Sequence, residues 1–100
     1  MVILRFKVTS KPDKSDELMA ALAEIITPAR ATKGVINFDI AQVLIEPDSF
    51  IATAVYEDGA GLERQESLPE VGRVMAMLPD SLVASPERTV FEASVHPTLV

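Results

Sequence analysis

Few residues in this chain could serve as a nucleophile, a general base or a metal ligand. The sequence has one histidine, His96, and no cysteine, which excludes disulfides, thiolate nucleophiles and metal sites built on cysteine. Because His96 precedes Pro97 in a predicted tail, we expect it to be solvated rather than paired with a serine. The serines also lack the G-x-S-x-G context of a hydrolase nucleophile. The sequence therefore holds no conventional catalytic machinery.

A short glycine pattern and the acidic residues point to no cofactor. Gly59 and Gly61 begin a G-x-G-x-x-G pattern, but Arg64 occupies the position of the third glycine. A dinucleotide-binding unit also does not fit in 100 residues. The carboxylates do not have the spacing of a calcium loop. We expect neither a cofactor nor a metal ion.

The remaining candidates are polar residues within or beside apolar segments. Asn37 interrupts one apolar run, Tyr56 ends another and Arg88 begins a third. Arg64 and Gln65 lie in a short segment with helical character. Each could bind a ligand, and each could equally be a sheet-surface residue, an edge hydrogen bond or part of a solvated helix face. The sequence leaves both interpretations open.

Methionines and glutamates add weaker candidates. Met75 fits a hydrophobic core, although methionine also lines adaptable pockets. Glu66 and Glu70 are expected to be solvated. Glu70 could act as a base only where burial raised its pKa.

Composition indicates one acidic globular domain. We expect it to span residues 1–100, with 96–100 as a tail, because 48% of the residues are hydrophobic and 24% charged. The formal net charge of −6 is a poor match for nucleic acid or anionic lipid, which attract cationic faces. With no apolar run of about 18 residues and no signal-peptide layout, we expect a cytoplasmic protein with no membrane or nucleic-acid partner.

Hydrophobic periodicity predicts four strands and two helical regions. Alternation at 2–8 is typical of a strand, and the apolar spacing from Leu18 to Ala29 is typical of an amphipathic helix. Asp13 or Ser15 is expected to cap that helix. Pro69 is expected to break the second helical region in two. The other predicted strands are 35–45, 50–57 and 88–95, and Glu46-Pro47-Asp48-Ser49 is predicted to form a type I turn in a hairpin.

The predicted order is βαββαβ, which is the ferredoxin-like α+β arrangement of a four-stranded antiparallel sheet with helices on one face. The second and third predicted strands are apolar in both registers. Because two helices cover only one face of such a sheet, the other face is expected to bind a second subunit. We therefore expect a homodimer through the sheet faces.

Several stretches together resemble the antibiotic biosynthesis monooxygenase family of dimeric α+β barrels, over about residues 2–95. Members of that family include oxygenases of quinols and anthrones that use no metal or flavin. Others degrade haem, and one group processes a small sugar phosphate. The matching stretches are 11–14, 29–40, 50–58, 61–62 and 67–69.

The resemblance implies a cofactor-independent monooxygenase of a small quinol- or anthrone-like aromatic substrate, with molecular oxygen as co-substrate. In such enzymes the substrate anion reduces oxygen, and the protein supplies a dry pocket and hydrogen bonds. The implied pocket lies between sheet and helices. Asn37 and Gln65 would hold the substrate oxygens, Arg88 or Arg64 would stabilise the anion, and Tyr56 and Met75 would wall the pocket.

The chain also departs from the family pattern, which keeps two other hypotheses open. Family members often have histidine where this chain has Gln65 and Glu70, and glutamine does not transfer protons near neutral pH. The second hypothesis is an isomerase or lyase of a small carbonyl compound, which could be phosphorylated. The third is a dimer that binds a small ligand without catalysis.

Overall fold

The computed structural model describes residues 1–95, and the predicted tail with His96 lies outside them. The chain forms a four-stranded sheet and three α-helices in the predicted βαββαβ order, with the second helical region in two pieces. In chain order the elements are β1 (Val2–Thr9), the 3-10 turn η1 (Pro12–Lys14), α1 (Ser15–Arg30), β2 (Val35–Val43), β3 (Glu46–Tyr56), α2 (Gly59–Glu66), α3 (Pro69–Ser81) and β4 (Glu87–Glu92).

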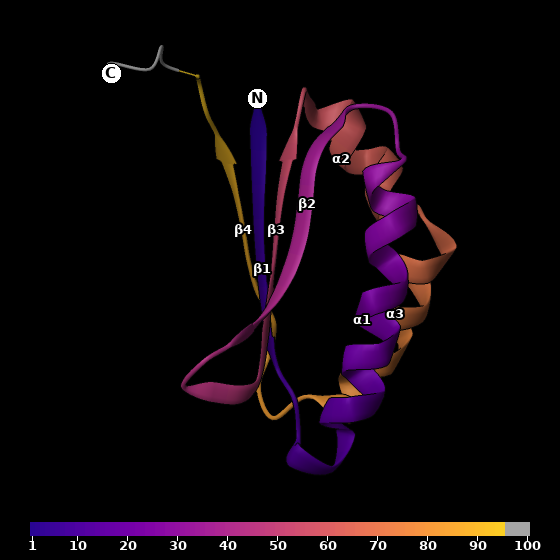
Figure 1. The fold of residues 1–100 in the computed structure, drawn as a ribbon, viewed down its shortest axis with the longest axis vertical. Helices are drawn as coiled ribbons and strands as arrows, with labels where there is room; N and C mark the ends of the chain where they lie inside the picture. The colour runs from indigo at the N-terminus through magenta and orange to yellow at the C-terminus, as the bar shows by residue number, and fades with distance from the viewer. Residues whose placement is uncertain (96–100) are drawn as a thin grey trace.

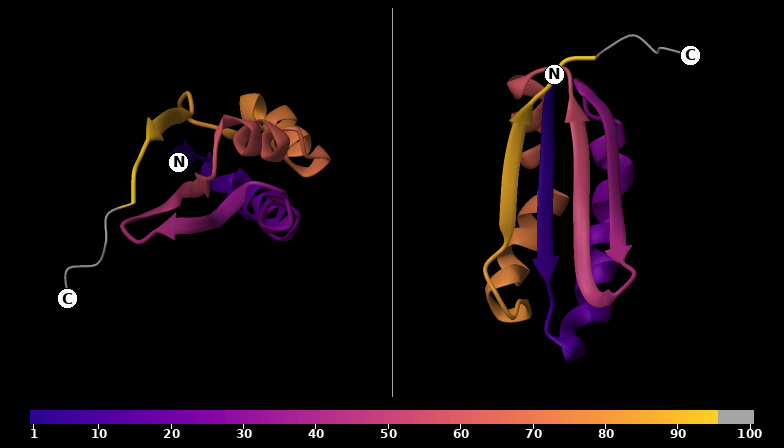
Figure 2. Two further views of the ribbon diagram at one scale, coloured as in Figure 1. Left: turned by 90° about the horizontal axis from the view of Figure 1, so that it is seen from above. Right: turned by 90° about the vertical axis from the view of Figure 1, so that its left-hand side faces the viewer.

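The structure has two layers, with the sheet on one side and the helices on the other (Figure 1). The strand order is β2-β3-β1-β4, and every neighbouring pair is antiparallel. Each edge strand is therefore reached from a central strand by a helical crossover over one face, as the ferredoxin-like prediction requires. Viewed from the sheet side, the four strands lie in front and all the helices behind them (Figure 2, right).

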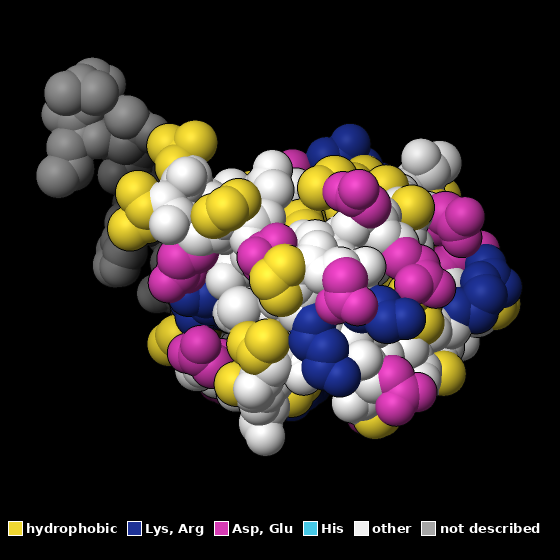
Figure 3. Space-filling model, turned by 90° about the horizontal axis from the view of Figure 1, so that it is seen from below, with side chains coloured by type: hydrophobic (Ala, Val, Ile, Leu, Met, Phe, Trp, Pro, Cys, Tyr) yellow, Lys and Arg dark blue, Asp and Glu magenta, His cyan; other side chains and the backbone are white. Residues whose placement is uncertain are grey.

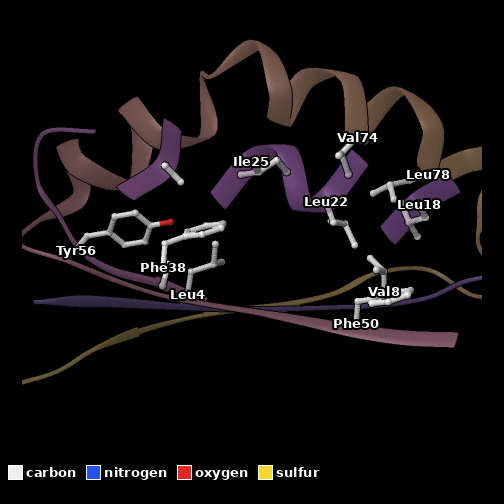
Figure 4. Packing of buried hydrophobic residues seen from close by; sticks show 12 residues of the cluster. Leu4, Val8, Leu18, Leu22, Ile25, Phe38, Phe50, Tyr56, Val74 and Leu78 are labelled. Carbon is white, nitrogen blue, oxygen red and sulfur yellow. The ribbon is translucent and has the colours of Figure 1, made fainter. Parts of the chain in front are cut away.

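Alternation along the central strands decides which side chains meet the helices. Leu4 pairs with Ala54, and Val8 pairs with Phe50. Directly paired residues lie on the same face, and all four are buried. They pack against the apolar side of α1 and α3 (Figure 4). The buried helix residues in this core are Leu18, Leu22, Ile25, Ala29, Val74 and Leu78.

The hairpin between β2 and β3 differs from the predicted one. Its turn is Leu44–Ile45, and residues 46–49 belong to β3. The register jumps from Gln42↔Phe50 to Val43↔Glu46. Pro47 lies in this irregular stretch, where the sheet needs no hydrogen bond from its backbone nitrogen. The predicted turn was wrong because proline is also tolerated at a bulge. Both turn residues are more than 90% exposed.

Neither predicted capping residue closes the start of α1. Pro12–Lys14 forms a 3-10 turn that runs into α1, and Lys14 takes the N-cap position without a side-chain hydrogen bond. Ser15 is the first residue of the helix and is buried. The capping prediction was wrong because the 3-10 turn places Asp13 one residue before the N-cap and Ser15 inside the helix.

Pro69 divides the second helical region, as predicted. It stands at the first position of α3, where a proline costs no helical hydrogen bond. The preceding short helix α2 has a conventional cap, since the Asp58 carboxylate accepts from the Gly61 N–H at 3.1 Å. Asp58 therefore fixes the start of α2, and Pro69 separates its end from α3.

The other sheet face is not covered by any element among residues 1–95 (Figure 2). It carries the odd-numbered residues of β1, including Ile3, with Val55 of β3 and Phe91 of β4 beside it. All six residues of β4 are exposed. Figure 3 shows the end of the molecule at which α1 begins, and acidic, basic and hydrophobic side chains are mixed there. No helix in the described part of the chain is long and apolar enough to span a membrane.

Candidate functional site

A cavity of about 90 Å³ lies between the sheet and the helices. It is mainly apolar, and polar side chains reach it from α2 and β4. Sites for drug-sized ligands occupy roughly 300–1,000 Å³, so this cavity suits a molecule of about one ring. The lining residues are Leu4, Phe6, Leu22, Ile25, Phe38, Ile40, Ala52, Gln65, Glu66, Val71, Val74, Met75 and Arg88.

Two other hollows are larger but less suited to chemistry. One of about 390 Å³ lies beneath the segment that joins α3 to β4, and one of about 180 Å³ lies between α1 and β2. Both are lined almost entirely by apolar side chains, with Ser85 in the first and Gln42 in the second. Ligand sites combine apolar walls with a few convergent polar groups, and the cavity with Gln65 and Arg88 meets that description best.

Tyr56 and Gln65 form a buried hydrogen bond beside the cavity. The Tyr56 hydroxyl donates to Gln65 Oε1 at 2.6 Å, and the two residues are 0% and 3% exposed. The Tyr56 hydroxyl points into the space between sheet and helices (Figure 4). Burial raises the pKa of the Tyr56 phenol well above its usual range, the nearby Glu66 carboxylate raises it further, and Arg88 opposes them. Tyr56 is therefore a neutral hydrogen-bond donor.

An ion pair between Glu66 and Arg88 crosses from α2 to β4. Arg88 Nη2 lies 3.0 Å and 3.2 Å from the two carboxylate oxygens of Glu66. Both side chains line the cavity and are also partly exposed to solvent. Arg88 pairs with Phe6 in the sheet, so its side chain starts from the helix-facing side. The pair thus lies where the cavity meets solvent.

A close glycine contact holds α2 in place. A Cβ on Gly61 would lie 2.8 Å from the Gly34 carbonyl oxygen, and Gly34 itself has a φ of +89°. The Arg64 guanidinium donates to the Lys33 carbonyl oxygen at 2.9 Å in the same region. These contacts attach the start of α2 to the loop before β2 and so set the position of Gln65.

Asn37 lies on the other side of the sheet from the cavity. It pairs with Val55, whereas its neighbour Phe38 pairs with Ala54 and lines the cavity. The Asn37 side chain is exposed and donates to Asp39 Oδ2 at 2.9 Å. The prediction that Asn37 shares a pocket with Gln65 was wrong, because strand alternation turns it to the uncovered face.

The other predicted site residues divide into two groups. Gln65, Arg88 and Met75 line the cavity, and Tyr56 lies directly behind Gln65. Arg64 and Glu70 do not line it. Arg64 binds the Lys33 carbonyl, and Glu70 lies 3.7 Å from Arg73 on α3.

Sequence reasoning missed Glu66, which was expected to be solvated. It lines the cavity and is therefore placed better than Glu70 to accept a proton from a ligand. Its position directly after Gln65 gave a weak signal, but its partner Arg88 is 22 residues away. Among residues 1–95, no group of three or more histidine, cysteine, aspartate or glutamate side chains is arranged to hold a metal ion.

Comparison with known proteins identifies the family. The profile described as "Antibiotic biosynthesis monooxygenase" (ABM) matches residues 1–77. The chain belongs to the antibiotic biosynthesis monooxygenase family. A relative from Synechocystis, the uncharacterised protein sll1783, is 24% identical over 98 residues, which are 98% of this chain and 67% of that protein.

Solved structures share the fold. Rv0793 from Mycobacterium tuberculosis superposes with a TM-score of 0.87 at 21% identity, covering 97% of this chain and 98% of that one. PA3566 from Pseudomonas aeruginosa gives 0.84 at 20% identity, with 94% of both chains covered. The crystal structure of an antibiotic biosynthesis monooxygenase gives a TM-score of 0.85 at 15% identity, covering 95% of this chain and 100% of that one. These similarities confirm the ferredoxin-like α+β fold of the ABM family.

Proposed function

We propose that this ABM-family protein oxygenates a small quinol-like aromatic substrate in the cavity between sheet and helices, without a metal or organic cofactor. The observation that carries the proposal is the lining of the cavity. Phe6 and Phe38 belong to mostly apolar walls, and Gln65, Glu66 and Arg88 provide the polar groups. A planar aromatic ring with an oxygen substituent matches this division better than a strongly polar ligand.

In this proposal the substrate supplies the electrons and the protein supplies the environment. A phenolic C–H reacts with O2 to give a quinone C=O and one molecule of water, so the two oxygen atoms of O2 end in product and water. The substrate must first lose its phenolic proton, because the anion reduces oxygen far more readily than the neutral phenol, and a group that favours the anion helps this ionisation. Arg88 carries the positive charge that does so.

Glu66 and Gln65 have complementary roles in the proposal. The Glu66 carboxylate is the acidic group in the cavity lining and would accept the phenolic proton as the substrate replaces it beside Arg88. The Gln65 amide would hydrogen-bond a substrate oxygen. Met75 and the phenylalanines would exclude water from the reacting ring.

We also propose that two copies associate through their uncovered sheet faces. Ile3, Val55 and Phe91 lie in one row across that face, and Phe91 is 49% exposed. Burial of such residues against a second subunit removes apolar surface from water. The helices, and with them the cavity, would then lie on the outer sides of the dimer.

Phosphorylated ligands fit the cavity less well. Within residues 1–95, one cationic side chain lines it, and that side chain is already paired with Glu66. A phosphate carries about two negative charges and prefers several donors. An isomerase or lyase of a phosphorylated carbonyl compound is therefore the weaker proposal.

The experiment that tests the proposal is oxygen uptake by the metal-stripped protein with a panel of hydroquinones and anthrones. Autoxidation is subtracted, and Gln65→Ala is compared with Gln42→Ala, an exposed glutamine outside the cavity. Saturable uptake that is lost in Gln65→Ala and kept in Gln42→Ala supports the oxygenase. Turnover without oxygen supports the isomerase or lyase, and binding without turnover supports a ligand-binding dimer.

A further inference from the structure

The two ends of the Gln65 amide have different surroundings. Its Oε1 accepts the Tyr56 hydroxyl proton. Among residues 1–95, no side chain or backbone group hydrogen-bonds its Nε2. Gln65 lines the cavity while Tyr56 does not. With its oxygen turned toward Tyr56, the amide therefore has its NH2 group on the cavity side.

The geometry of the contact supports this orientation. The distance of 2.6 Å from the Tyr56 hydroxyl oxygen to Gln65 Oε1 is typical of an O–H···O bond, whereas N–H···O bonds are mostly near 2.9–3.0 Å. Tyr56 is fully buried and keeps its proton, because burial raises the pKa of its phenol. A neutral phenol can donate or accept a hydrogen bond, and the short distance is the one expected when it donates to the acceptor end of the amide.

A buried amide N–H that lacks a partner is costly unless water or a ligand satisfies it. Gln65 as a whole is 3% exposed, but in residues 1–95 no fully buried side-chain nitrogen or oxygen lacks a hydrogen-bond partner, so the unpartnered NH2 group keeps a small surface open to solvent. A ligand that fills the cavity would displace solvent from this NH2 group and would have to accept its hydrogen bond in place of water. A ligand of the same shape without an acceptor atom would leave the NH2 group buried and unpaired.

We propose that Tyr56 is a positioning residue that fixes the Gln65 amide with its NH2 group in the cavity, so that the cavity selects ligands with a carbonyl or oxyanion oxygen over ligands of the same shape without one. This inference rests on the proposed use of the cavity as a ligand site. It does not depend on which reaction follows. The ligand class is defined by one atom, an oxygen that accepts a hydrogen bond from the Gln65 NH2 group.

The test compares two single-ring probes of nearly identical shape. Acetophenone has a carbonyl oxygen where α-methylstyrene has a methylene carbon. Both are titrated into the protein, and dissociation constants are read from NMR shifts of the cavity residues. We expect acetophenone to bind roughly tenfold more tightly to the wild-type protein, as one hydrogen bond to a donor that the bound ligand shields from water predicts.

Tyr56→Phe removes only the hydroxyl that holds the amide, and Gln65→Met removes the amide at similar length. In both variants we expect the affinity ratio of the two probes to fall close to one. A purely structural role of Tyr56 would weaken both probes equally and leave the ratio unchanged. Gln42→Ala is the control that should keep the full ratio, because Gln42 does not line this cavity.

The orientation can also be read without any ligand. The sequence contains two glutamines and one asparagine, Gln42, Gln65 and Asn37, so the side-chain amide signals are assigned from single substitutions. Nuclear Overhauser contacts from the Gln65 NH2 protons to Phe38 or Met75 support the assignment. Stronger contacts to the Tyr56 ring protons would contradict it.

A ratio near one in the wild-type protein, or a full ratio in both variants, would overturn the inference, as would failure of both probes to bind. These readouts are separate from oxygen uptake. If the protein shows the tenfold ratio but consumes no oxygen, the orientation of Gln65 is supported and the oxygenase is rejected. If it consumes oxygen but shows no preference for the carbonyl probe, the oxygenase is supported and the orientation of Gln65 is rejected.

Discussion

Gly61 at the start of α2 packs against the Gly34 carbonyl so closely that a methyl group at Gly61 would lie 2.8 Å from that oxygen. The same carbonyl accepts the Glu57 N–H at 2.8 Å. The loop before β2, the end of β3 and the first turn of α2 therefore share one carbonyl group. This junction sets where Gln65 stands.

Gly61→Ala should destabilise the protein, because the new methyl group meets backbone that cannot move without disturbing three elements. We expect a loss of about 2–3 kcal/mol in the free energy of unfolding, measured by urea denaturation. Gly59→Ala is the matched control in the same helix, since nothing lies within 4 Å of its Cβ position. Equal stabilities of the two variants would contradict this prediction, because the backbone around Gly34 would then move aside with little loss of free energy of unfolding.

Tyr56 should make stability depend on pH on the alkaline side. Because burial raises its pKa in the folded state, only the unfolded chain releases the phenolic proton just above the ordinary value of about 10. The contribution is fully present below about pH 10 and is lost as the pH rises further. The wild type should therefore lose more stability than Tyr56→Phe between about pH 9.5 and 11.5, in urea unfolding at each pH.

The same shift has a direct optical readout. Tyr56 is the only tyrosine in the sequence and there is no tryptophan, so absorbance near 295 nm reports its ionisation alone. In the folded protein the phenolate signal should appear only well above pH 10. A folded protein that titrates at the ordinary value would contradict the burial of the hydroxyl.

Arg88→Met should affect binding of an anion far more than stability. Its ion pair with Glu66 is between partly exposed side chains, and solvent screening limits such pairs to about 0–1 kcal/mol. In the cavity, however, Arg88 is the group proposed to favour the substrate anion. We expect kcat/KM for a hydroquinone to fall roughly tenfold or more, while the melting temperature changes by only a few degrees.

Arg73→Met serves as the control, because Arg73 is an exposed arginine on α3 that pairs with Glu70 and does not line the cavity. It should leave kcat/KM unchanged. If both arginine variants lowered kcat/KM alike, the effect would belong to overall charge and not to the cavity.

Val55→Glu should prevent association through the uncovered sheet face. Val55 lies at the centre of that face, between Ile3 and Asn37 in the register, and two copies would bring the new carboxylates into the apolar row of Ile3, Val55 and Phe91. We expect a dimer for the wild type and a monomer for the variant, measured by sedimentation equilibrium. Ala76→Glu, on the exposed side of α3, should remain dimeric. A wild type that is itself monomeric would reject the proposed dimer.

Much of the fold could be predicted because periodicity and helix breakers act locally. Alternation in β1, the apolar spacing of α1 and Pro69 between α2 and α3 each depend on neighbouring residues. The hairpin turn could not be located in this way. Leu44 and Ile45 carry no turn signal, and Pro47 suggested a turn where the chain forms an irregular strand.

The candidate site was less predictable, because it depends on which face of β2 the helices cover. Both faces of that strand are apolar in sequence, so alternation separates Asn37 from Phe38 without showing which of them is inside. The ion pair of Glu66 with Arg88 also joins residues from different elements. Such pairings follow from the packing of α2 over the sheet, which no local pattern encodes.

The exposed position of β4 has a consequence for how quickly the cavity exchanges its contents. β4 is an edge strand whose only partner in the sheet is β1, and it carries Arg88 at the cavity. Local opening is easiest where few contacts must be broken. In a single chain, amide protons of β4 should therefore exchange with deuterium sooner than those of β3, and fraying at this edge would open a way out of the cavity for a bound molecule.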